Sequence, residues 1–253
     1  TGPDLSALSP AEQQAVLSFA KQIDLENAQQ VLEYGASAQK NIADFSDTAL
    51  AKVKTGDLGE IGTMLSGLLV ELKTLEEPEK KGIAGLFRKA KINSEELKAR
   101  FSTAEVNVDR ISGELEKHKV TLLKDVAVMD QMYDRNLQYF KELTMYILAG
   151  KQKLAEARST TLRELREKAE ASNLPEDAQA ANDFENKCVR FEKKLHDLEL
   201  TRMISLQTAP QIRMIQNNDT ALVEKIQTSV LNTIPLWKNQ MVLSLGIEHS
   251  NQA

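Results

Sequence analysis

The residues Ser172-Asn173-Leu174-Pro175 separate two segments, 94–171 and 176–249, that are each more than seventy residues long. Both segments carry apolar residues at helical spacing, and neither shows the alternation that is typical of a strand. Two helices of that length bury their apolar faces only by lying against one another. The sequence therefore predicts an all-α fold: an elongated antiparallel helical bundle or coiled coil with two very long helices and an N-terminal set of shorter helices.

The composition agrees with long helices and limits the classes of function. The 253 residues are 42% apolar, 27% charged and only 5% aromatic, and the net charge is −5. An acidic balance argues against nucleic-acid binding, because neutralising phosphates requires a concentrated positive surface. No apolar run approaches the ~20 residues that cross a bilayer, and the first residues do not form a signal peptide. We expect a soluble protein in the cytoplasm, with peripheral contact to the inner membrane left open.

Three shorter helices are predicted before residue 78. Ser9 and Pro10 read as the cap and first residue of a helix that ends near residue 23. A second helix is expected over residues 24–54, with Leu32 on its apolar face and Gly35 weakening its middle. A third is expected over residues 58–75. We interpret residues 1–77 as N-terminal helices that pack on the bundle, 78–93 as a basic linker, and 94–253 as a long kinked hairpin.

The linker contains a short amphipathic pattern. Its apolar residues follow helical spacing, and cations surround them. One interpretation is a segment that lies on an anionic membrane surface with its apolar side inserted, and the other is a short helix docked on the bundle with ordinary solvated charges. The membrane-surface candidates are Lys80, Lys81, Ile83, Leu86, Phe87, Arg88, Lys89 and Lys91.

A buried apolar stripe is predicted along each long segment. From Leu97 to Leu122 its spacing alternates between four and three residues, which is the heptad of a coiled coil. The phase then shifts by about one residue, and the predicted stripe continues through Leu137. In the returning segment the predicted stripe includes Cys188 and Met203.

Four residues are predicted to bend the long helices. Gly113 and Gly150 are the expected bends of the first segment. Pro210 and Pro235 should kink the second, because each proline removes a backbone donor.

Polar residues gather in the middle of the predicted hairpin. If the chain turns near residue 173, position i lies roughly opposite position 347 − i, which sets Asn136 near Gln211 and Asp130 near Asn217. The constellation could be a site for a ligand, ion or partner between helices. It could instead be a hydrogen-bond network that fixes helix register and satisfies the carbonyls freed at Pro210. The candidate partner- or ligand-binding residues are Asp130, Asn136, Gln207, Gln211, Arg213, Gln216, Asn217 and Trp237.

The sequence offers little for catalysis, metals or cofactors. The three histidines are too dispersed for a metal motif, and no nucleophile is paired with a base at a defensible spacing. Cys188 is the single cysteine, which excludes an internal disulfide framework and any multi-cysteine metal site. Its place on the apolar stripe favours a buried small hydrophobe over a redox thiol. We therefore expect no cofactor, no metal and no enzymatic activity.

Several stretches resemble a known family. The most specific is Leu206-Gln207-Thr208-Ala209-Pro210-Gln211-Ile212-Arg213, followed by Ile215-Gln216-Asn217-Asn218 and by Ile234-Pro235-Leu236-Trp237-Lys238. Together with shorter stretches from about residue 30 onward, they resemble the bacterial toxic-anion-resistance family, also called tellurite-resistance TelA-like proteins. The resemblance implies a role in tellurite resistance and stress responses, and a further helical segment beyond residue 253, so that this chain looks truncated. It supplies no catalytic residues.

These observations lead to a non-enzymatic stress-resistance protein as the first hypothesis. It would act as a helical scaffold whose kinked middle engages a protein partner or a membrane-associated complex. The alternatives are direct anion binding, with Arg202, Arg213 and Lys238 supplying charge, and peripheral membrane binding through the linker. Direct chemistry on tellurite is disfavoured, because one buried cysteine does not support stoichiometric reduction. The oligomeric state is left open.

Overall fold

The computed structural model describes residues 3–55, 58–74 and 94–250, and within these ranges the ordered elements are all helices, with no strand. The all-α prediction with two very long helices is confirmed. The membrane-surface candidates Lys80–Lys91 lie outside the described residues. The domain boundaries predicted at residues 77 and 93 therefore stay a prediction.

The N-terminal region begins with short helical elements whose ends are capped by side chains. The 3-10 turn η1 (Leu5–Ala7) precedes α1 (Pro10–Gln22), and Ser9 caps α1 as predicted, its Oγ accepting from the Glu12 amide at 3.2 Å. Helix α2 (Ala28–Glu33) is capped by Asn27, whose Oδ1 accepts from the Gln30 amide at 3.1 Å. Helices α3 (Ala36–Thr55) and α4 (Leu58–Thr74) follow.

The prediction of one helix over residues 24–54 is wrong, because the chain breaks at Gly35. Gly35 has φ +68°, a left-handed conformation that favours glycine. A Cβ at this position would lie 2.8 Å from Cδ1 of Leu198. The break lets Tyr34 turn inward, where its hydroxyl donates to the Tyr146 carbonyl oxygen at 2.6 Å. Leu32, expected on the apolar face, is 74% exposed.

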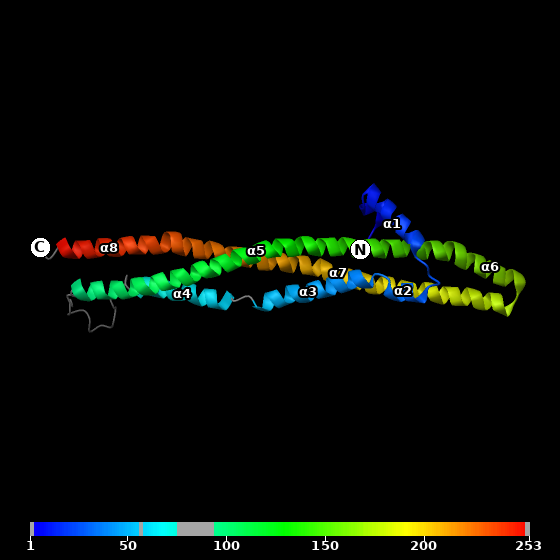
Figure 1. Ribbon diagram of the computed structural model, residues 1–253, viewed down its shortest axis with the longest axis horizontal. Coiled ribbons are helices and arrows are strands. Elements are labelled where there is room, and N and C mark those ends of the chain that lie inside the picture. Colours follow the sequence, from blue (N-terminus) through cyan, green and yellow to red (C-terminus); the bar gives the residue numbers. More distant parts are fainter. Residues whose placement is uncertain (1–2, 56–57, 75–93, 251–253) are drawn as a thin grey trace, which may run out of the picture. The chain divides into compact units, whose positions relative to one another are not determined.

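Two long helical segments lie within the described residues from 94 onward. The first consists of α5 (Ser94–Ala157), the π-helical segment η3 (Arg158–Leu162) and α6 (Arg163–Ser172), and α5 continues through Gly113 and Gly150. The second consists of α7 (Pro175–Thr228), the π-helical segment η4 (Ser229–Thr233) and α8 (Ile234–Ser250). Between them Asn173 adopts φ 51°, so the predicted break is a tight helical hairpin (Figure 1).

The widened π turns have local causes. Pro235 lacks the amide hydrogen that would bond to the carbonyl four residues earlier, and its ring crowds that carbonyl, so the turn before it is widened. Pro210, by contrast, lies inside α7. In η3 the hydroxyls of Ser159 and Thr160 both donate to the Glu156 carbonyl oxygen, at 3.2 and 2.7 Å, and compete with the backbone for that acceptor.

The chain divides into two compact units, each with its own core. Unit 1 comprises residues 1–54 and 131–213, and unit 2 comprises residues 55–130 and 214–253. In the core of unit 1 the ring centroid of Tyr34 lies 5.4 Å from that of Tyr146 and 5.0 Å from that of Phe191. The core of unit 2 contains Trp237, whose ring centroid lies 5.6 Å from that of Phe101.

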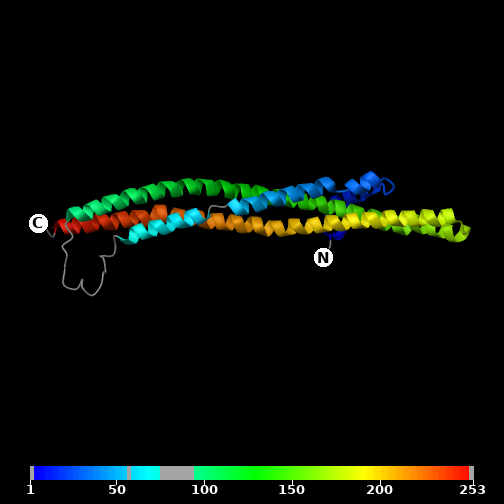
Figure 2. The ribbon, with the colours of Figure 1, turned by 90° about the horizontal axis from the view of Figure 1, so that it is seen from below.

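Ion pairs establish the antiparallel direction of the hairpin within unit 1. Arg166 pairs with Glu185 at 2.8 Å, Arg158 pairs with Glu192 at 2.6 Å, and Lys151 pairs with Glu199. One residue number rises as the other falls. In the same unit α3 lies beside α7, as Figure 2 shows.

Candidate interaction surface

In unit 1 the core changes from apolar to polar at Asn136 and Ser205. These side chains are 3% and 0% exposed, whereas Leu137 and Met203, both predicted to be buried, are 44% and 53% exposed. Asn136 donates from Nδ2 to the Ser205 carbonyl oxygen at 3.1 Å and accepts from the Ser205 hydroxyl at 3.0 Å. The predicted stripe is therefore wrong by one residue at 137 and by two at 203, because these paired polar groups occupy the interior.

Helix α3 extends this buried polar layer. The hydroxyls of Ser46 and Thr208 lie 3.2 Å apart, and the Gln39 side-chain amide donates to the Thr201 hydroxyl at 2.9 Å. Ser46, Thr201 and Thr208 are all buried. Because buried polar groups are costly unless paired, such a layer favours one alignment of α3, α5 and α7 over slipped ones.

Two arginines of this region lie over aromatic rings. The guanidinium of Arg202 lies 4.6 Å from the Phe140 ring centroid, and its Nε donates to the Thr144 hydroxyl at 3.1 Å. Burial lowers the pKa of Arg202 from its ordinary value. The guanidinium of Arg213 lies 3.9 Å from the Tyr133 ring centroid. Both cations already have partners inside unit 1.

The predicted pairing register is close, but it assigns different partners. Asn136 was expected opposite Gln211 and instead pairs with Ser205. Asp130 was expected opposite Asn217 and instead accepts from Gln216 Nε2 at 2.8 Å, within unit 2. Gln216 also donates to the Val126 carbonyl oxygen at 3.1 Å. The pairing of position i with position 347 − i does not hold along the whole hairpin, because the residues that face each other shift gradually where helices supercoil around one another.

The remaining predicted residues differ in exposure. Trp237 is buried in unit 2, and its indole Nε1 has no hydrogen-bond partner within the described part of the chain. The neighbouring Lys238 pairs with Asp109 at 2.7 Å. Gln207, Gln211 and Asn217 are exposed on α7. No observation tests a binding role for any of the eight candidates, so that role stays a prediction.

The outer surface of α7 in unit 1 reverses the usual polarity. Leu200, Met203 and Ile204 are 44–53% exposed, and they share one helical face with Gln207 and Gln211 because their spacings are three, four, seven and eleven residues. A neighbouring side of the same helix carries the buried hydroxyls of the polar layer, at Thr201, Ser205 and Thr208. Exposed apolar side chains grouped over a polar interior are typical of a surface that another molecule covers. We refer to these five residues as the α7 face.

Among the described residues, no group of three or more His, Cys, Asp or Glu side chains is placed so that it could hold a metal ion. Cys188 is buried as predicted, and burial raises the pKa of its thiol. Among the described helices, none is both long and apolar enough to cross a membrane.

The family model of the toxic anion resistance protein TelA matches residues 16–253. The chain belongs to this family. A TelA-like protein of Staphylococcus epidermidis is 41% identical over 251 residues, and one of Staphylococcus saprophyticus is 41% identical over 253 residues. These matches cover 97% and 98% of this chain and 67% of each relative, so the chain spans about two thirds of their length.

A more distant relative carries no functional name. An uncharacterised protein of Listeria monocytogenes is 38% identical over 251 residues, which cover 97% of this chain and 63% of that protein. No solved structure matches the chain. The resemblance seen in the sequence is therefore confirmed at the level of the family.

Sequence reasoning missed the exposed apolar members of the α7 face. No exposed apolar surface was predicted at Leu200 and Ile204, and Met203 was predicted to be buried. Ser205 could have indicated the correct phase. It is a small polar residue between apolar neighbours, and a buried stripe that runs through Ser205 instead of Met203, two residues earlier, agrees with the helical spacing equally well.

Proposed function

We propose that this member of the toxic anion resistance family acts without catalysis, as a helical scaffold that engages a protein partner through the α7 face. The observation that carries the proposal is the reversed polarity of α7, with paired hydroxyls inside and Leu200, Met203 and Ile204 outside. Exposure of these apolar side chains to water is unfavourable, and burying them against the apolar surface of a partner would lower the free energy.

The composition of the α7 face fits a protein partner. Its apolar residues supply area for burial, and the exposed amides of Gln207 and Gln211 supply donors and acceptors at the C-terminal side of them. An apolar centre with a polar rim is the usual anatomy of a protein–protein interface. Methionine adds adaptability because its side chain is unbranched and polarizable.

Direct anion binding through the three predicted cations has less support. Arg202 and Arg213 stack on rings of unit 1, and Lys238 is paired with Asp109 in unit 2. Each of these groups would have to share its charge and its donors between its present partner and an anion. The proposed scaffold would bind its partner through the α7 face without a rearrangement of these side chains.

The proposal is tested by charge on the α7 face. The double variant Leu200→Glu/Met203→Glu should lose tellurite resistance in a bacterial strain that lacks the native gene, with circular dichroism and melting unchanged, because both side chains are already exposed. Leu174→Glu is the matched control, since Leu174 is 52% exposed at the hairpin turn of the same unit. A photo-crosslinker at position 207 should trap a defined protein that the double variant no longer traps.

Two results would contradict the scaffold. If the folded double variant confers full resistance, the α7 face is not the working surface. If the purified protein converts tellurite catalytically, the proposal that it acts without catalysis is wrong.

A further inference from the structure

Helices α2 and α7 lie near one another in unit 1 (Figure 1). A groove with a volume of about 430 Å³ lies between them and forms a second surface of this unit. That volume lies within the range of roughly 300–1,000 Å³ that is common for small-molecule sites. The groove is lined by Leu25, Glu26, Ala28, Val31, Leu32, Lys187, Arg190, Lys193, Lys194 and Asp197.

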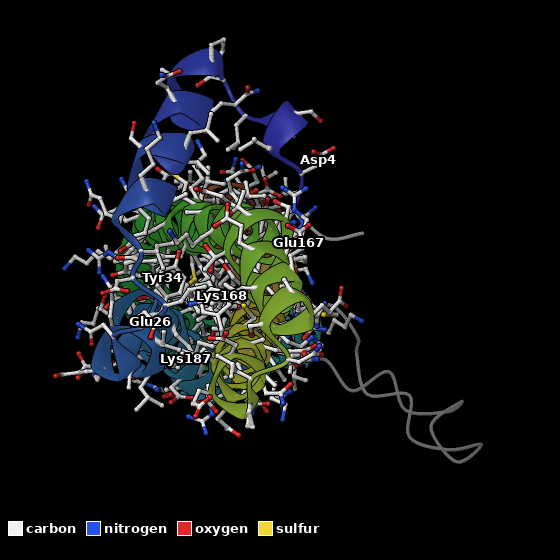
Figure 3. All side chains as sticks on the ribbon, turned by 90° about the vertical axis from the view of Figure 1, so that its right-hand side faces the viewer. Asp4, Glu26, Tyr34, Glu167, Lys168 and Lys187 are labelled. Atoms are coloured by element: carbon white, nitrogen blue, oxygen red, sulfur yellow. The ribbon has the colours of Figure 1, made fainter. Side chains whose placement is uncertain are left out.

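One wall of the groove is cationic. Lys187, Arg190 and Lys194 are spaced by three and seven residues, which places them on one face of α7, and Lys193 lies next to them. Lys187 pairs with Glu26, and the two side chains lie together in Figure 3. Within the described part of the chain, Arg190, Lys193 and Lys194 have no ion pair. They offer three cations to a ligand.

The other wall is apolar. Leu25 is buried at its base, Val31 is half-buried, and Leu32 is left 74% exposed at its rim. Asp197 is the one carboxylate among the lining residues besides the paired Glu26. An apolar wall next to these three cations matches a molecule that has an apolar body and an acidic end.

We propose that this groove binds a small acidic amphiphile, namely a single phosphate or carboxylate head group attached to an acyl chain. The head group receives charge-assisted hydrogen bonds from Arg190 and Lys194, and the chain covers Leu25, Val31 and Leu32. A bare oxyanion would use only the cationic wall and leave Leu32 exposed to water. The groove is separate from the α7 face and does not depend on the partner proposed for it.

The test uses dodecyl phosphate as the probe, below its micellar concentration, in titration calorimetry with the whole chain. We expect saturable binding of one molecule per chain. Inorganic phosphate and a neutral dodecyl maltoside should each bind at least about tenfold more weakly, since each lacks one half of the recognition. The variant Arg190→Glu/Lys194→Glu should weaken binding of dodecyl phosphate by at least about tenfold.

Two further variants separate the groove from general detergent binding. Lys141→Glu reverses an exposed cation of α5 in the same unit and should leave the affinity unchanged. Ala28→Trp fills the groove from an exposed position and should block the chain while circular dichroism stays native.

The proposal is overturned if dodecyl phosphate produces no saturable heat, or if it binds Arg190→Glu/Lys194→Glu as tightly as the native chain. Equal affinity for inorganic phosphate would also overturn it, because the apolar wall would then contribute nothing. Tighter binding of an acidic peptide than of dodecyl phosphate would assign the groove to a protein segment instead.

Discussion

Replacing Asn136 by alanine should lower the free energy of unfolding by about 2–4 kcal/mol. The substitution removes two buried hydrogen bonds to Ser205, each worth about 1 kcal/mol, and leaves a small cavity that adds about 1 kcal/mol. The Ser205 hydroxyl then also lacks its acceptor at a position that is 0% exposed. Urea unfolding followed by circular dichroism measures the change.

A double-mutant cycle makes the prediction specific to the pair. Ser205→Ala alone leaves the Asn136 Oδ1 unpaired and should cost about 1–3 kcal/mol, while the double variant should show a coupling of about 1 kcal/mol. Asn182→Ala on the exposed surface of α7 is the control and should change stability by less than about 0.5 kcal/mol. If Asn136→Ala is as stable as the native chain yet loses tellurite resistance, the polar layer is a binding site and not a device that fixes register.

Three further predictions follow from single positions. Gly35→Ala should lower the free energy of unfolding by about 2–4 kcal/mol, because Gly35 has a positive φ and a Cβ there would lie too close to Leu198. Gly113→Ala should raise it by about 0.5–1 kcal/mol, because a Cβ there would meet no atom within 4 Å, and urea midpoints equal to that of the native chain would contradict both predictions. Trp237→Phe should change stability by less than about 1 kcal/mol, because the indole N–H that it removes has no partner among the described residues, and this offsets the lost area. A loss above about 3 kcal/mol in urea unfolding would contradict this reasoning. Burial raises the pKa of the Cys188 thiol in the folded chain, so the thiol of the unfolded chain ionises first and the free energy of unfolding should fall as pH rises through the ordinary thiol pKa of 9.0. The urea midpoint of Cys188→Ala should lack this part of the decline, and parallel curves of midpoint against pH for the two proteins would refute the prediction.

The sequence predicted most elements where a local signal was strong. Ser9 and Pro10 placed the start of α1, and the break at 172–175 placed the hairpin. It failed at Gly35, because a glycine inside a helical pattern reads as a weak helix residue until a neighbour such as Leu198 forbids a side chain there. It also failed at Leu137, which was assigned to the buried stripe because it is apolar, whereas the neighbouring Asn136 is the buried residue and Leu137 is exposed.

The sequence by itself determined that the chain is helical, that two long helices return on one another, and that it resembles a toxic anion resistance protein. Those properties rest on spacing, turn residues and motifs that act over a few residues. Only the tertiary structure decided that Asn136 and Ser205 lie inside while Leu137 and Met203 lie outside. A shift of one or two residues in phase costs little within one helix, and the buried hydrogen bonds to neighbouring helices decide between the alternatives.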